Sequence, residues 1–219
     1  MNTAEWYDAD DYSLAYAETA DPRVLAVIQL DQEPSAPYGD ALAPAYYLGL
    51  RYHWMTERAG DVYHDEQSDR AAAAYAEALG HFCGRRDREE VAARYLRIFH
   101  GVTALHRLGG DSDADVLIFD TPSYREHVGM PPTLADSLEG ERNEWRAYLD
   151  GDVYGIGYAV NPNRTTAETP VEDVWDDFEV EIECWGVYGR DRAEESAARF
   201  DYGAPELAPL IDAEGKVFA

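Results

Sequence analysis

The chain has 219 residues, of which 46% are hydrophobic and 12% aromatic, enough to exclude a disordered chain and to bury a core. Acidic residues number 44 against 18 basic ones, and the formal charge of −26 argues against direct binding to nucleic acid, because carboxylates and phosphates repel. No stretch reaches the roughly 20 apolar residues of a membrane-spanning helix. The acidic beginning of the chain lacks the apolar run of a secretory signal, so we expect a cytoplasmic protein with no membrane partner.

The acidity itself has three explanations that composition leaves open. The protein can be adapted to high salt, it can use an anionic surface to imitate DNA or to bind a basic partner, or it can simply be soluble. Lys216 is the single lysine, and this preference for arginine tells nothing about function.

The first half of the chain begins with an acidic arm over residues 1–21, which we expect to dock on the core. Arg23 to Leu30 is a nearly continuous apolar run, typical of a central strand. A long loop with four breakers follows, and 48–55 (LGLRYHWM) predicts another strand. A loop of this length usually belongs to a functional surface.

The middle of the chain predicts two helices. The first spans 67–82, with Ser68 as its cap and Tyr75 and Leu79 on its buried side. The second spans 87–100, where Asp87 and Glu90 have the spacing of a capping box. Its apolar face is formed by Val91, Tyr95 and Ile98, with Leu96 and Phe99 beside them.

Two strands, 102–108 and 114–119, are expected to pair around the turn at 109–111. Asp120 then caps a short helix that ends at Gly129, which explains this carboxylate more simply than a catalytic role at a strand end. Residues 134–149 predict one more helix, and 201–219 a segment that covers the core.

Residues 151–200 carry the clearest local signal. Residues 153–160 and 178–184 alternate like strands, with Glu179, Glu181 and Glu183 pointing to the wet side. Gly155 and Gly157 leave room for Trp185 to lie across them, or else they mark a bulge or a close approach of two backbones. A helix follows, with a capping box formed by Asp191 and Glu194 and with Ala193, Ala197 and Phe200 on one face.

The cysteines, Cys83 and Cys184, stand alone without CxxC spacing, which predicts buried thiols in a reducing compartment. Cys184 falls on the apolar side of its strand with no histidine near it in sequence. We therefore interpret it as a small buried hydrophobe rather than a nucleophile.

Together these elements predict an α+β fold in which a mixed, mostly antiparallel sheet is packed by several helices. The chain shows neither an internal repeat nor a low-complexity linker, so we expect a single domain over residues 1–219.

The best candidate for a metal or acid–base site is a group around His53, His64 and Asp65, with Asp61 and Glu66 nearby. Its spacing matches no zinc or EF-hand template, and an exposed polar loop explains it as well. Phosphate-loop, dinucleotide-fingerprint and HExxH motifs are absent from the sequence, so we assign no catalytic residue and no cofactor.

A second candidate is an acidic stretch with eight carboxylates and no cation: Glu168, Glu172, Asp173, Asp176, Asp177, Glu179, Glu181 and Glu183. One exposed strand face presents a carboxylate every ~6.6 Å, whereas duplex DNA carries one charge per ~1.7 Å of its axis. A DNA mimic would therefore need several elements to align. The plainer alternative is a solvated acidic face.

Three groups of residues together resemble a family of small proteins that phages and mobile elements encode and whose function is not established. They are 31–54 (DQEPSAPYGDALAPAYYLGLRYHW), 90–101 (EVAARYLRIFHG), and 144–160 (EWRAYLDGDVYGIGYAV) followed by 183–191 (ECWGVYGRD). The chain departs from the family pattern in having GDVYGIGY for a GDVYGY-like run and Val187 where an aromatic residue is usual. The resemblance implies a phage or mobile-element origin and brings no catalytic residue with it.

The leading hypothesis is therefore a non-enzymatic accessory protein that binds a host protein with a basic or DNA-binding surface, with counter-defence by DNA mimicry as its specific version. The alternatives are a small metal-dependent enzyme using His53, His64 and Asp65, and a salt-adapted housekeeping protein.

Overall fold

The computed structural model describes residues 5–9, 14–49, 56–108, 115–129 and 137–199. They form two compact units, unit 1 from 1–34 with 151–219 and unit 2 from 35–150. The sequence, which lacks a linker, predicts one domain. Unit 2 is one uninterrupted stretch of the chain between β3 (Val24–Leu30) and β10 (Val153–Val160), two strands of unit 1. Both units combine helices with antiparallel strands, which confirms the predicted α+β class.

Unit 1 is built on a five-stranded antiparallel sheet in the order β1-β2-β3-β10-β11. Its strands are β1 (Tyr7–Asp8), β2 (Leu14–Glu18), β3 (Val24–Leu30), β10 (Val153–Val160) and β11 (Glu179–Tyr188). β3 is the central strand, as its apolar run predicts. The acidic arm supplies β1 and β2, so its described residues are part of the sheet itself.

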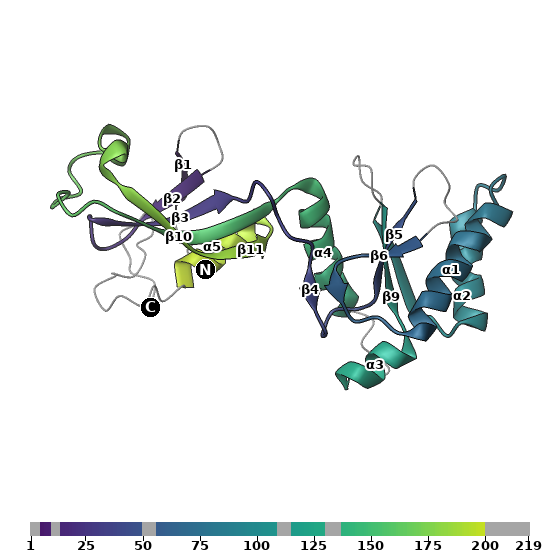
Figure 1. Ribbon diagram of the computed structural model, residues 1–219. Helices are drawn as coiled ribbons and strands as arrows, with labels where there is room; N and C mark the ends of the chain where they lie inside the picture. The colour runs from purple at the N-terminus through teal and green to yellow at the C-terminus, as the bar shows by residue number, and fades with distance from the viewer. Residues whose placement is uncertain (1–4, 10–13, 50–55, 109–114, 130–136, 200–219) are drawn as a thin grey trace. The chain divides into compact units, whose positions relative to one another are not determined.

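The two faces of this sheet are covered by different elements. Helix α5 (Arg190–Arg199) lies against β3 and β10 (Figure 1), where Ala193 and Ala197 pack on Ile28 and Ile156. The opposite face is covered by two short 3-10 turns, η2 (Val171–Asp173) and η3 (Trp175–Asp177).

Unit 2 has three layers. Its four-stranded antiparallel sheet has the order β6 (Thr56–Arg58), β5 (Ala45–Leu48), β9 (Asp115–Asp120) and β8 (Ala104–Leu108). Helices α1 (Glu66–His81) and α2 (Arg88–Phe99) pack on one side of it, and α3 (Pro122–Val128) and α4 (Ser137–Asp150) on the other (Figure 1). A short parallel pair, β4 (Tyr38–Gly39) and β7 (Asp61–Val62), completes the unit.

Two of the predicted helix caps, those of α1 and α3, are wrong in detail. The α1 cap is Asp65, whose side chain accepts a hydrogen bond from the Ser68 N–H at 2.8 Å, so Ser68 is not the cap. Thr121 caps α3, and Asp120 instead forms a buried pair with Arg125. A side-chain oxygen caps best three residues before the N–H that it receives, and competing polar neighbours decide which residue takes that position.

The predicted capping boxes at Asp87 and Asp191 are also not formed as expected. Asp87 precedes α2 without a side-chain cap and pairs with Arg85 at 2.7 Å. α5 already begins at Arg190, which places Asp191 inside its first turn, and Glu194 accepts from Arg190 at 2.8 Å. In both cases a nearby arginine attracts the carboxylate more strongly than a backbone N–H does.

Most of the predicted apolar face of α2 is turned away from the core, and of its members Leu96 is the one that is fully buried. Ala92 and Leu96 are fully buried, whereas Tyr95, Ile98 and Phe99 are 39%, 61% and 69% exposed. The core side of α2 lies against α1, which presents alanines there. A close helix pair needs small side chains at the contact, so the larger residues point outward.

A bulge changes the predicted pattern of β11. Ile156 pairs with Cys184 and Gly157 pairs with Ile182, so Glu183 is an extra residue in the ladder. One extra residue reverses the face of the side chains that follow it, here until a second register shift, between Tyr154 and Ile156, restores the original alternation by Val187. Cys184 therefore lies on the opposite face from Ile182, although the alternation predicts a shared face.

Both cysteines are exposed, so the prediction of buried thiols is wrong. Cys184 lies on β11, which is an edge strand, and Cys83 follows the C-terminus of α1. An edge strand and a helix end are each covered on fewer sides than the centre of a sheet or helix, which explains their exposure.

The sequence left two explanations for the glycines of β10, namely room for Trp185 or a close approach of two backbones. Each explanation is correct at one of the two glycines. A Cβ at Gly155 would lie 2.5 Å from the indole of Trp185, so the tryptophan does lie across this glycine. A Cβ at Gly157 would meet the Glu181 carbonyl oxygen, which is a close approach of two backbones at the bulge.

Some predictions lie outside the described residues: most of the 48–55 strand, the turn at 109–111, Leu134, Phe200 and the covering segment 201–219.

Candidate interaction surface

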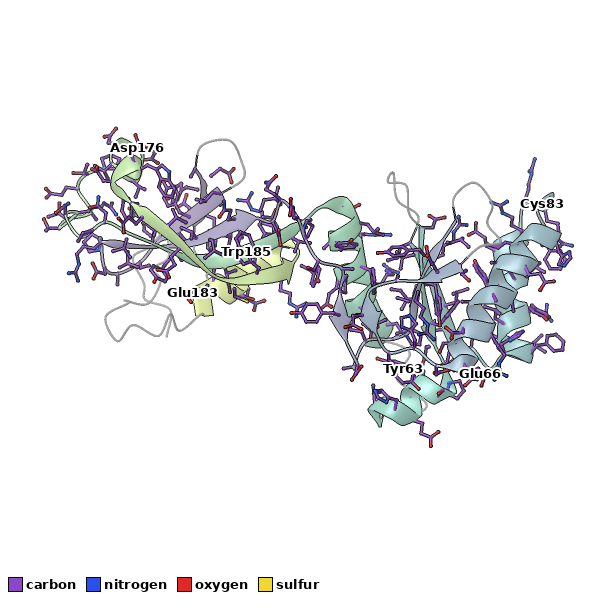
Figure 2. The ribbon with its side chains drawn as sticks, viewed as in Figure 1. Tyr63, Glu66, Cys83, Asp176, Glu183 and Trp185 are labelled. Atoms are coloured by element: carbon purple, nitrogen blue, oxygen red, sulfur yellow. The ribbon has the colours of Figure 1, made fainter. Side chains whose placement is uncertain are left out.

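The eight carboxylates of the acidic stretch lie on consecutive pieces of unit 1, which we call the acidic segment (168–183). Glu168 precedes η2, two pairs occupy η2 and η3, and three glutamates follow on β11. All eight are exposed, and none of them takes part in an ion pair within the described part of the chain. Figure 2 shows Asp176 at the turn before β11 and Glu183 along the strand. Residues 165–189 contain no lysine, arginine or histidine.

Two buried apolar side chains hold this segment in place. Val171 and Phe178, 3% and 8% exposed, pack on Leu25, Val27 and Ala159 of the sheet. Because both ends of the two turns are anchored inward, the polar residues between them are left facing water. The acidic side chains are thus presented by a packed scaffold and not by a loose loop.

A row of aromatic rings lies beside the acids. Tyr7 stacks on Tyr16 at 5.6 Å, Tyr16 on Trp175 at 5.4 Å, and Trp175 on Phe178 at 6.1 Å between ring centroids. The row joins the N-terminal strands to the acidic segment. Aromatic faces next to carboxylates favour cationic side chains, because ring quadrupole and charge attract the same group.

Hydroxyl groups, not cations, contact the acids. Tyr16 donates to Glu172 at 3.1 Å and Tyr158 donates to Glu181 at 2.7 Å. The bond to Glu181 raises the pKa of Tyr158 to about 12. Such phenols satisfy one lone pair of a carboxylate and leave its negative charge uncompensated.

The arginines next in sequence are engaged elsewhere in unit 1. Arg164, with its side chain 3% exposed, binds Glu18 and two backbone carbonyls. Arg190 binds Asp8 and Glu194, each at 2.8 Å. Two acids of the N-terminal arm, Asp8 and Glu18, are therefore neutralised, whereas those of the acidic segment are not.

The described members of the candidate metal site are engaged in other contacts. His53 lies outside the described residues. Both ring nitrogens of His64 are at 2.8–2.9 Å from backbone carbonyls of Val62 and Ala45, and Asp65 is occupied as the α1 cap. Among the described residues, no three histidines, cysteines or acids are grouped to hold a metal ion.

One buried carboxyl in unit 2 was not singled out by the sequence. Glu141 on α4 is 8% exposed and accepts from the Ala43 N–H at 2.7 Å, and burial raises its pKa to about 7. The Tyr124 hydroxyl lies 2.9 Å from Glu141 and also contacts the Ala41 carbonyl. Since one phenol has one hydrogen, both contacts are satisfied when Glu141 is protonated and donates to Tyr124. Helical spacing gives the only sequence signal, because Glu141 shares a face with Leu138 and Trp145.

No family model, curated protein or solved structure matches the chain. The fold and surface therefore define the class only: an α+β protein of two compact units, one of which carries a contiguous, uncompensated acidic segment. Within the described residues no helix has the length and apolar character needed to cross a membrane.

Proposed function

We propose that this chain is a non-enzymatic accessory protein that uses the acidic segment to bind a host protein with a basic or DNA-binding surface. The observation that carries the proposal is eight exposed carboxylates with no cationic partner among the described residues, within a stretch that has no basic residue. Leaving like charges side by side opposes folding, so a surface of this kind is best explained by a partner that neutralises it.

The scaffold supports this function in two ways. The acids are already exposed, so a partner's arginines and lysines reach them without any opening of the fold. They are also held by a packed sheet, so little conformational entropy is lost on binding. Association driven this way is fast and strongly salt-dependent.

DNA mimicry is the finer version of the proposal, and a phage or mobile-element origin is what the family resemblance implies for it. The carboxylates come from three elements, η2, η3 and β11, and so are more closely spaced along the chain than those of a single strand face, which supports this version. A protein that opposes host DNA-binding proteins would present such a surface to the site where they bind phosphates.

The test is affinity capture from a bacterial lysate at low salt with three versions of the full chain. The first is wild type, and the second carries amides at all eight positions of the acidic segment. The third carries amides at eight exposed acids of unit 2: Asp40, Glu57, Asp61, Glu77, Glu90, Glu126, Glu139 and Asp150.

We expect mass spectrometry to find the same basic or DNA-binding protein with wild type and with the unit 2 variant, and to lose it with the acidic-segment variant. Equal capture by all three versions, or capture of no basic protein by wild type, would overturn the proposal.

A further inference from the structure

The acidic segment ends in a strand whose outer side has no partner among the described strands. β11 is ten residues long and pairs with β10 on one side only. An edge strand directs alternate N–H and C=O groups away from its sheet, where they can pair with a further strand. The outer edge of β11 is therefore a template for an extended segment of another chain.

The side chains of β11 disfavour a second copy as that segment. Two copies of the strand side by side would bring Glu179, Glu181 and Glu183 near their equivalents, and like charges across a strand pair are destabilising. The same three charges favour a strand with arginine or lysine at alternate positions.

Trp185 gives this edge an apolar anchor. Its indole is 49% exposed although it lies flat over Gly155, where a Cβ would collide with it. Val180, 40% exposed, is the other large apolar residue left open on the strand. Figure 2 shows Trp185 and Glu183 on the same strand. A positioned, half-exposed tryptophan beside charges is typical of the residues that dominate protein interfaces.

We propose that the outer edge of β11 binds an extended, arginine- or lysine-bearing segment of the partner as an additional strand. Backbone hydrogen bonds align this segment, Glu179, Glu181 and Glu183 meet its cationic side chains, and Trp185 packs on its apolar or guanidinium groups. The inference rests on the proposed function, and it names both the part of the surface used and the conformation of what binds there.

The experiment uses the full chain and a defined probe, an acetylated eight-residue peptide in which arginine and valine alternate. A second peptide has the same side chains and charge, but every backbone amide is N-methylated, so it cannot donate hydrogen bonds to an edge. Binding is measured by fluorescence anisotropy at low salt. Amide hydrogen exchange of residues 179–188 is followed by mass spectrometry.

We expect the unmethylated peptide to bind at least about tenfold more tightly than the methylated one, because strand addition depends on main-chain hydrogen bonds, and to slow exchange in β11. We also expect Trp185→Ala to weaken binding about tenfold or more, as loss of an interface anchor does. The matched control is Tyr38→Ala, which removes a 69% exposed aromatic residue of unit 2 and should leave binding unchanged.

Equal affinity for the two peptides, with no slowing of exchange in β11, would overturn strand addition while leaving binding through charge intact. An unchanged affinity of Trp185→Ala would overturn the anchor. If neither peptide binds, strand addition fails, and capture from the lysate then decides separately whether the acidic segment has a partner at all.

Discussion

The two units of this protein differ in the number of their acidic residues and in how these residues are paired with cations. Unit 1 has 24 acidic and 6 basic residues, and unit 2 has 20 and 12. In unit 2 many acids are paired, as Asp69 is with Arg58 and Asp120 with Arg125, and the unpaired ones are spread over separate elements. In unit 1 the acids of 168–183 are consecutive and uncompensated. The net charge of −26 is therefore distributed unevenly, with the larger share in unit 1.

The largest effect of a substitution on stability is expected at the buried ion pair of unit 2. Asp120 and Arg125 have side chains 3% and 9% exposed, joined by a bond of 2.6 Å from Nε to Oδ1. Asp120→Ala leaves a buried guanidinium without its main partner, which should lower the free energy of unfolding by about 3–5 kcal/mol. Urea unfolding followed by circular dichroism measures it.

Asp177→Ala is the control, because Asp177 is exposed and has no cationic partner among the residues that the structure describes. It should change stability by no more than about 0.5 kcal/mol. If Asp120→Ala and Asp177→Ala were equally stable, the distinction between a paired acid that stabilises the fold and an exposed acid that does not would be contradicted.

The next largest effect on stability is expected at α2, where a substitution on the buried side should cost more than one on the exposed side. Leu96 is fully buried against α1, so Leu96→Ala should cost about 2–5 kcal/mol by leaving a cavity. Ile98 is 61% exposed two residues later, and Ile98→Ala should cost about 0.5 kcal/mol or less. Chemical unfolding of both variants measures this. If Ile98→Ala lowered the free energy of unfolding more than Leu96→Ala, the buried side of α2 would be the one that contains Ile98, as the sequence predicts.

The buried Glu141 should make unit 2 sensitive to pH. Its pKa rises from 4.5 to about 7 on folding, so its protonated form is favoured in the fold. The stability it contributes is fully present below pH 4.5 and is lost as pH rises through 7, with a total loss of about 3 kcal/mol at 1.36 kcal/mol per pKa unit.

Glu141→Gln removes this titration and keeps both an acceptor for Ala43 and a donor for Tyr124. The variant should exceed wild type in stability at pH 8, and the gap should narrow toward pH 5. Glu139→Gln, an exposed neighbour, should show no such dependence. A gap that does not change with pH would exclude a protonated Glu141.

The smallest effect concerns the acidic segment itself. Replacing its eight carboxylates by amides should raise the free energy of unfolding at low salt by about 1–2 kcal/mol, because repulsion between them is removed. Thermal melts at low and high ionic strength measure the difference, which salt should screen. Loss of the wild-type fold at low ionic strength would instead favour the salt-adapted alternative.

The sequence predicted those features that depend on neighbouring residues. The apolar run of β3, the alternation of β10 and the space over Gly155 for Trp185 are all present. The α+β class follows from the same local signals.

The features it missed depend on contacts between distant residues. The face of α2 is decided by α1, and the position of Cys184 by a bulge that only the pairing with β10 defines. The acidic segment was found because its residues are contiguous. The stacked row of Tyr7, Tyr16 and Trp175 was not, because it joins β1 and β2 to η3, which lies more than 150 residues later in the chain.

The most direct measurement is the salt dependence of binding to octa-arginine, compared among wild type, the eight-amide variant of the acidic segment and the eight-amide variant of unit 2. Both variants lose the same formal charge, so only the position of the charge differs. We predict that affinity and its dependence on salt collapse in the first variant and stay close to wild type in the second. Equal losses in the two variants would show that net charge alone attracts cations and would contradict a dedicated acidic surface.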